Sequence, residues 1–172
     1  MIKPNTLIII ATGIVGGPGK GLFQFLKTSP KDAFDYQLCN FYKRKLKQFN
    51  TDFINFAKLS QINVHLIQQN WILDPLLISR AHDLAQKFNC NLVQSHGYKS
   101  NILSFFLKKI FGHPWIGFAH GYTSDNAKMR VYNWMDQRVL RSADRVVAVS
   151  GGMKNLLVEK GVPEEKISVI RN

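Results

Sequence analysis

IIIATGIVGGPGKGLFQF, residues 8–25, is the stretch of sequence on which the fold prediction rests. Its first part is short, apolar and bounded by glycine, which predicts a buried strand. Its last part carries apolar residues at helical spacing, namely Leu22, Phe23, Phe25 and Leu26, so we expect the glycines between a strand and a helix. Free N–H groups at a helix start, with Lys20 beside them, favour an anion-binding site at Gly16, Gly17 and Gly19.

The glycine-rich stretch does not match the phosphate-binding loop of nucleotide triphosphatases. Gly16 and Gly21 have the required separation, but Leu22 follows where Lys and then Ser or Thr are needed. The sequence therefore argues against ATP hydrolysis.

A dinucleotide-binding fingerprint is also poorly matched. Gly17, Gly19 and Gly21 give G-x-G-x-G, and the end of the next predicted strand carries Cys39 and Asn40 instead of an acid for the ribose. The loop by itself indicates a phosphate or a sugar, or else a tight turn that only lets the first helix pack on the sheet.

Length and charge limit the classes of protein. The 172 residues suffice for one α/β domain with a real core, and 20% charged with 45% hydrophobic residues excludes a disordered chain. Lys and Arg exceed Asp and Glu by 12. This excess favours polyanions such as nucleic acid, phosphate-bearing substrates or an anionic membrane, although a solubilising surface needs no partner.

The cysteines and the lengths of the apolar segments indicate the cellular compartment of the protein. Cys39 and Cys90 adjoin predicted strands without metal-ligand spacing, so we expect buried thiols in a reducing compartment. No apolar run reaches the 18 residues of a transmembrane helix. We therefore predict a cytoplasmic protein.

Strand and helix patterns alternate along the whole chain, which predicts a parallel sheet of about seven strands with helices on both faces. Asp74 before Pro75 and Ser150 are predicted helix N-caps. In the predicted helix 125–142, an apolar side is formed by Val131, Trp134, Met135, Val139 and Leu140. Further strands are expected at 34–41, 63–68, 91–95, 114–119, 145–149 and 167–170, and further helices at 49–59, 74–88, 98–110 and 150–161.

Two similar segments follow neighbouring predicted strands: residues 96–98 and residues 120–122 both read His-Gly-Tyr. Ligands of such sheets bind beyond the carboxyl ends of the strands, where the glycine-rich loop is also expected. Ser-His-Asp order with a nucleophile elbow, metal-ligand clusters and close carboxylate pairs are not apparent. The chain is therefore not expected to carry all of a catalytic site.

The C-terminal third of the sequence resembles a known family. It contains AHGYTSDN, then YNWMDQRVLRSADRVVAVS, then LVEKGVPEEKISVIRN. This run is similar to the N-terminal domain of family-4 glycosyltransferases of the GT-B fold, and the loop at Gly16 and Gly17 fits as well. The likeness is strongest over residues 118–172.

The resemblance implies an enzyme built from two Rossmann-like domains. The N-terminal domain holds the acceptor and the C-terminal one holds the nucleotide sugar; we expect residues 1–172 to be a single acceptor-side domain without the C-terminal one. The implied activity is retaining hexosyl transfer from a nucleotide sugar to a glycan or lipid-linked acceptor in polysaccharide or lipopolysaccharide synthesis. Neither a cofactor nor a metal is expected, and this chain alone is expected to be inactive.

The resemblance also implies roles for individual residues. His120 would lie beside the transferred sugar as the catalytic residue, and Gly16 and Gly17 against the donor phosphate or the acceptor. No general base is needed from this domain, because the departing phosphate can take the acceptor proton. Further substrate contacts are expected from Gly19, Lys20, His96, Tyr98, Lys99, Gly121 and Tyr122. For the group around His96 a polar helix start is the alternative, and for His120 a core histidine bonded to backbone.

Basic and aromatic residues also suggest a membrane surface as a partner. The alternative is that the phenylalanines are core and the lysines solvated. A dinucleotide-binding module and a basic nucleic-acid-binding module are the other readings, but no recognised nucleic-acid fold is present and no nucleic-acid partner is expected. The membrane residues are Lys43, Arg44, Lys45, Lys47, Phe105, Phe106, Lys108, Lys109 and Phe111.

Overall fold

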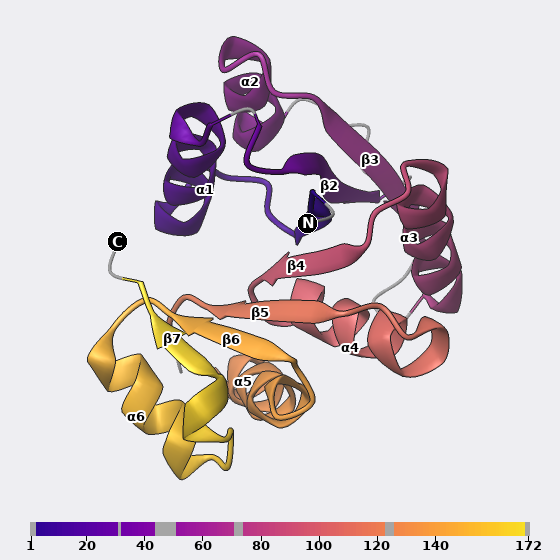
Figure 1. The fold of residues 1–172 in the computed structure, drawn as a ribbon. Coiled ribbons are helices and arrows are strands. Elements are labelled where there is room, and N and C mark those ends of the chain that lie inside the picture. Colours follow the sequence, from indigo (N-terminus) through magenta and orange to yellow (C-terminus); the bar gives the residue numbers. More distant parts are fainter. Residues whose placement is uncertain (1–2, 31, 44–50, 71–73, 123–125, 171–172) are drawn as a thin grey trace. The chain divides into compact units, whose positions relative to one another are not determined.

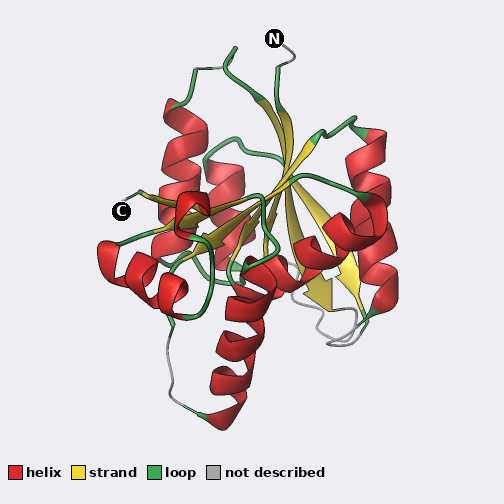
Figure 2. Cartoon of the chain, turned by 60° about the horizontal axis from the view of Figure 1, so that its bottom comes forward, coloured by secondary structure: helices red, strands yellow, loops and turns green. Residues whose placement is uncertain are grey.

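The computed structural model describes residues 3–30, 32–43, 51–70, 74–122 and 126–170. They divide into two compact units, residues 1–92 and 93–172, and each unit is described by itself. Strands and helices alternate along the sequence of both units. Figure 2 draws the helices in red and the strands in yellow. The expectation that residues 1–172 form a single domain stays a prediction.

The first unit contains β1 (Asn5–Ile10), α1 (Gly17–Thr28), β2 (Asp35–Lys43), α2 (Asp52–Leu59), β3 (Val64–Gln69) and α3 (Pro75–Lys87). Its strands are parallel in the order β3-β2-β1, with Ile8 opposite Leu38 and Leu38 opposite Val64. Figure 1 shows α1 and α2 on one side of these strands and α3 on the other.

The core of the first unit forms where α1 and α2 meet alternate residues of β1. Ile8 and Ile10 pack with Phe23 of α1 and Phe53 of α2, whose rings lie 4.9 Å apart. Leu7 and Ile9, which are fully buried, point to the opposite face because strand side chains alternate. Both faces of β1 are therefore covered, which explains its continuous apolar sequence.

The second unit contains β4 (Leu92–His96), α4 (Tyr98–Phe111), β5 (Trp115–Ala119), α5 (Ala127–Leu140), β6 (Arg145–Ala148), α6 (Gly151–Glu159) and β7 (Ile167–Val169). A 3₁₀ turn, Glu164–Lys166, precedes β7. The strands are parallel in the order β4-β5-β6-β7. Gly117 lets α5 approach β5 closely, because a Cβ there would lie 2.4 Å from Leu140 Cδ2.

The predicted α/β fold with about seven parallel strands is confirmed, and most boundaries shift by one to three residues. Asp74 and Ser150 are N-caps as predicted, accepting from the N–H of Leu76 and Met153. Cys39 and Cys90 are buried free thiols. Among the described residues, no helix is both long and apolar enough to cross a bilayer.

Two predictions about helices were wrong. The first helix begins at Gly17, not after the glycines, because Pro18 in its first turn has a backbone angle preset for helix. In α5 the prediction is wrong in part: Leu140 is buried and Met135 and Val139 are half-buried, but the other two residues of the predicted apolar side are exposed. Val131 and Trp134 are 56% and 54% exposed, whereas Asn133 and Asp136 are buried. Asp136 is turned inward because it finds hydrogen-bond donors there.

Candidate functional site

Two histidines meet at the carboxyl ends of β4 and β5. His96 is the last residue of β4 and lies opposite Phe118 in β5. His120 follows two residues after Phe118, so the alternation of a strand brings it to the same face as His96. The prediction that the two His-Gly-Tyr segments share one edge is therefore met by direct contact within the second unit.

The two imidazoles are hydrogen-bonded to each other. Nδ1 of His96 lies 2.9 Å from Nε2 of His120, and the rings are inclined by 21°. The ring of Phe118 stacks on His96 with centroids 4.4 Å apart. Nε2 of His96 lies 2.8 Å from Nε2 of Gln94, two residues earlier on the same strand face. These contacts hold His120 through its Nε2 atom.

Burial keeps the histidine pair neutral. His96 is buried and His120 is half-buried. Burial, and then the neighbouring His120, hold the pKa of His96 well below its usual value. Burial also lowers the pKa of His120 to about 4. At neutral pH each ring therefore has one N–H and one acceptor nitrogen, so the pair can position a ligand and donate to it without carrying charge.

A buried polar network lies on the opposite face of the same strand ends. Trp115 Nε1 donates to Ser95 Oγ at 2.6 Å, and Ser95 Oγ donates to Asn101 Oδ1 at 2.6 Å. Asn101 Nδ2 donates to Asp136 Oδ1 at 2.8 Å, and Tyr122 OH donates to Asp136 Oδ2 at 2.8 Å. This network joins β4, α4, β5 and α5 and holds Tyr122, which is two residues after His120.

Asp136 is a buried carboxylate whose oxygens accept hydrogen bonds from two neutral groups, Asn101 and Tyr122. Burial raises its pKa to about 6, while the hydrogen bonds from Asn101 and Tyr122 act in the opposite direction. Burial and the neighbouring Asp136 raise the pKa of Tyr122 above its usual value. Tyr122 is therefore a neutral donor that ties the segment after β5 to α5.

The other residues predicted in the second unit have different surroundings. Tyr98 stacks on Tyr132 of α5 with ring centroids 4.7 Å apart, and this contact fixes the start of α4. Lys99 is half-buried. Gly121 is exposed and has a φ of 118°, a backbone conformation that side chains disfavour. Ligand contacts by these residues stay predictions.

The glycine-rich loop belongs to the first unit. Gly16 is the N-cap of α1, and no side chain supplies a capping hydrogen bond there. Gly17 and Lys20 are exposed, and Gly19 is buried against Val15 and Phe53. The expected arrangement of a glycine N-terminus with a nearby cation is thus present in α1, and anion binding by it stays a prediction.

Asn40, which lies inside β2, has a structural role. It is buried, and its Nδ2 donates to the backbone oxygen of Thr12 in the glycine-rich loop at 2.7 Å. Its Oδ1 accepts from the N–H of Phe41 at 2.7 Å. Asn40 therefore anchors the loop, in the place where a dinucleotide-binding protein needs an acid for the ribose.

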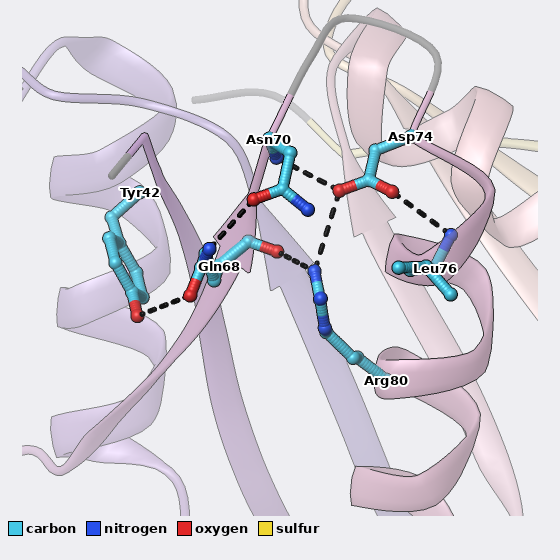
Figure 3. Close-up of polar contacts among 6 residues, drawn as sticks. All are labelled: Tyr42, Gln68, Asn70, Asp74, Leu76 and Arg80. Atoms are coloured by element: carbon cyan, nitrogen blue, oxygen red, sulfur yellow. Dashed lines mark hydrogen bonds and ion pairs between the residues drawn. The ribbon is translucent and has the colours of Figure 1, made fainter. Parts of the chain in front are cut away.

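The sequence analysis missed a polar cluster at the carboxyl end of β3, drawn in Figure 3. Asp74 accepts from the N–H groups of Asn70 and Leu76 at 2.9 and 3.0 Å, and Arg80 lies 3.4 Å from its Oδ2. Arg80 also donates to the backbone oxygen of Gln68 at 2.7 Å. Asp74 therefore caps α3 and also joins that helix to β3.

Metal ligation is not suggested by the part of the chain that the structure describes. No group of three or more His, Cys, Asp or Glu side chains there is arranged to hold an ion. The expectation that no metal takes part stays a prediction.

Comparison with known proteins shows the family. The family model described as Glycosyltransferase Family 4 matches residues 38–172. The chain belongs to glycosyltransferase family 4. Its fold is that of the N-terminal domain of a GT-B glycosyltransferase, as the resemblance implied. No curated protein sequence matches this family-4 chain.

Three solved structures are similar to the family-4 chain. Anabaena Alr3699/HepE in complex with UDP and glucose has a TM-score of 0.77 and 17% identity, over 97% of this chain and 44% of that one. The apo lipopolysaccharide outer core galactosyltransferase WaaB gives 0.67 and 16%, over 98% and 45%. Neisseria meningitidis UDP-GlcNAc 2-epimerase bound to UDP-GlcNAc gives 0.67 and 14%, over 96% and 46%. The family-4 chain therefore spans less than half the length of each.

Sequence reasoning about the family-4 chain found His96 and His120 but missed the residues that support them. Gln94, Asn101 and Asp136 carry no motif, and Asp136 lies in a helix whose apolar residues suggested another buried face. The spacing of Asn133, Asp136 and Leu140, at i, i+3 and i+7, is the only sequence signal of that inward stripe.

Proposed function

We propose that this chain is the acceptor-side domain of a cytoplasmic retaining glycosyltransferase. A sugar would pass from a nucleotide-sugar donor to a glycan or lipid-linked acceptor. The bond from the sugar to the diphosphate breaks, the bond to the acceptor oxygen forms on the same face, and the departing phosphate takes the acceptor proton. A second, nucleotide-sugar domain outside this chain would supply most of the donor contacts.

The observation that carries the proposal is the neutral His96–His120 pair at the strand ends of a family-4 chain. A neutral imidazole donor suits a sugar hydroxyl or a developing phosphate charge, and it leaves the acceptor proton to the departing phosphate. The uncapped start of α1 adds N–H groups for an anion. The UDP and UDP-GlcNAc complexes of similar structures support a nucleotide sugar as the donor class.

Binding experiments test the proposal against its alternatives. Isotope-labelled protein is titrated with UDP-glucose, a nicotinamide dinucleotide and single-stranded RNA, and backbone amide shifts are followed. The nucleotide sugar is expected to shift His120, and the other two ligands are not. A dinucleotide response at the end of β2 would favour the dinucleotide module, which Asn40 argues against.

Turnover experiments test whether this chain alone can catalyse sugar transfer. This chain with a nucleotide sugar and candidate acceptors is expected to give no sustained transfer, because the charge that stabilises the departing diphosphate lies outside it. Sustained transfer by residues 1–172 would overturn that. Because a 2-epimerase is among the similar structures, UDP-GlcNAc is assayed for epimerisation with the enzyme that contains this domain. Epimerisation without transfer would replace the proposed reaction.

We also propose that α4 rests on an anionic membrane surface. Phe106, Ile110 and Phe111 are exposed on its C-terminal half, beside the exposed Lys109. Phe106 and Phe111 are therefore not core residues, whereas Lys108 is ion-paired with Asp144. Exposed apolar side chains insert at a membrane surface, and basic residues attract anionic headgroups. The chain has a net charge of +12. Of the basic run, Arg44, Lys45 and Lys47 lie outside the described residues.

Vesicle sedimentation tests the membrane surface. Binding to anionic vesicles is expected at low salt and is expected to fade as salt rises, because the Debye length shortens. Replacing Phe106 and Ile110 by Ser should abolish it. The matched control replaces Val131 and Trp134, which are equally exposed on α5, and should bind normally. Equal binding to neutral and anionic vesicles would contradict the proposal.

A further inference from the structure

The side-chain amide nitrogen of Gln94 faces His96. The two residues are two apart on β4 and therefore share a strand face. The atom of Gln94 that faces Nε2 of His96, at 2.8 Å, is the amide nitrogen. An amide nitrogen donates and cannot accept, so Nε2 of His96 must be the acceptor and carries no proton.

The direction of that first bond determines the direction of the bond between the two histidines and the position of the proton on His120. A neutral imidazole whose Nε2 is bare carries its proton on Nδ1, so His96 donates from Nδ1 to Nε2 of His120. Nε2 of His120 is then an acceptor, and the proton of His120 must sit on Nδ1. Both rings are neutral because burial lowers their pKa values.

We propose that Gln94 is a positioning residue that acts through His96 to hold His120 as its Nδ1–H tautomer. His120 then meets a ligand as a hydrogen-bond donor and not as a base. The inference rests on the proposed function for the identity of the ligand atom, which is an oxygen of a sugar hydroxyl or of a phosphate.

The surroundings of His120 support a donor that awaits an acceptor. Its Nδ1 is buried and has no hydrogen-bond partner among the residues from 74 to 122 or elsewhere in the described chain. An unpaired buried N–H is unfavourable, and a ligand oxygen that accepts from it removes that cost. The exposed Gly121 follows directly and puts no side chain beside that position.

The first unit contains a comparison pair with the opposite direction. Nε2 of His65 lies 2.8 Å from the amide oxygen of Gln37, across β2 and β3. An amide oxygen only accepts, so His65 must carry its proton on Nε2. The same two residue types therefore enforce opposite tautomers at two places in this chain.

Long-range ¹H–¹⁵N correlation spectra of the ligand-free protein at pH 7 test the proposal directly. The spectra distinguish the protonated from the bare nitrogen of each ring. His96 and His120 should show Nδ1–H, and His65 should show Nε2–H. An Nε2–H tautomer at His120 in the unmodified protein would overturn the proposal without any variant.

Gln94→Glu tests whether Gln94 is the cause. A carboxylate only accepts, so His96 must then donate from Nε2, and the bond between the two histidines reverses its direction. His120 should change to the Nε2–H tautomer. The matched control, Gln37→Glu, keeps an acceptor next to His65 and should leave all three tautomers unchanged. A folded Gln94→Glu protein in which His120 still shows Nδ1–H would refute the assignment.

A second variant covers the case in which Gln94→Glu does not fold, as judged by circular dichroism. Gln94→Met removes the donor without adding charge, and His120 should then populate both tautomers. A single Nδ1–H tautomer in Gln94→Met would also refute the assignment.

These results separate this inference from the proposed function. If the tautomers are as expected but no nucleotide sugar or acceptor perturbs the protein, the proposed function fails and the role of Gln94 stands. If UDP-glucose shifts His120 while His120 shows Nε2–H, the role of Gln94 fails and the proposed function stands.

Discussion

The side-chain amide of Asn101 in α4 donates to Oδ1 of Asp136 in α5 at 2.8 Å. Through this bond a carboxylate is buried between two helices, and its second oxygen accepts from Tyr122 in the segment that also contains His120. The hydrogen bonds offset the desolvation of the charge only in part, so the pKa of Asp136 stays raised. The bond from Tyr122 therefore ties the segment after β5 to a carboxylate whose burial is unfavourable when it is ionised, so the stability of this arrangement depends on pH.

Asp136→Asn should remove that pH dependence. The folded pKa of Asp136, about 6, exceeds its ordinary value of 3.8, so the folded state binds more protons between these values. Its contribution to the free energy of unfolding is thus fully present below pH ~4 and falls by about 3 kcal/mol as pH rises through 6. Urea unfolding at pH 4 and 7 should show this difference between wild type and Asp136→Asn. Parallel pH profiles would contradict it.

His120 should make stability depend on pH in the opposite direction, and His120→Gln should remove that dependence. The folded pKa of His120, about 4, lies below its ordinary value of 6.5, so the unfolded state binds more protons between these values. Stability from the neutral ring is present above pH ~6.5 and falls by about 3 kcal/mol as pH drops to 4. Gln retains an oxygen to accept from His96 but does not titrate. Unfolding of the variant should therefore depend less on pH from 4 to 7, and an equal or steeper dependence would count against the buried neutral pair.

Two substitutions should separate the two functions of the His120 side chain, which are to contact the substrate and to accept the hydrogen bond from His96. In the active enzyme, His120→Ala and His120→Gln should each slow transfer by ~10²-fold, the scale of one lost transition-state hydrogen bond. Only Ala leaves the Nδ1–H of buried His96 unpaired, which should lower stability by about 1–3 kcal/mol. Rates and thermal unfolding are measured on the same preparations. An unchanged rate in the folded Gln variant would refute the catalytic assignment.

Gly117→Ala should destabilise the second unit. The added Cβ would lie 2.4 Å from Leu140 Cδ2, so the buried Leu140 side chain, or α5 with it, must move away from β5, at a cost of about 1–3 kcal/mol. Gly151→Ala is the control, because a Cβ there meets nothing within 4 Å. Thermal melts should show a loss for Gly117→Ala only. Combining it with Leu140→Val should restore part of the stability, and no recovery would argue against this contact.

Asp74→Ala should destabilise the first unit more than the loss of an ordinary cap. Asp74 accepts from two backbone N–H groups and pairs with Arg80, whereas Thr51 caps α2 through the N–H of Ile54 alone. We expect about 2 kcal/mol for Asp74→Ala and about 1 kcal/mol for Thr51→Ala. Denaturant unfolding measures both. Equal losses would mean that the cluster in Figure 3 adds nothing beyond capping.

The sequence by itself determined the order of strands and helices, the N-caps at Asp74 and Ser150, and the common edge for His96 and His120. These features depend on local periodicity and on the rule that parallel strands end at one edge, both of which are written in neighbouring residues. Family membership was also visible, in the motifs of residues 118–172.

Only the tertiary structure decided which nitrogen of His120 faces His96, and which atom of Gln94 lies against His96. It also decided that α5 buries Asp136 and exposes Trp134, against the apolar pattern of that helix. The physical reason is that a buried polar side chain is tolerated where donors such as Asn101 and Tyr122 reach it. Those donors come from other elements of the chain, and their distances exist only once the chain has folded.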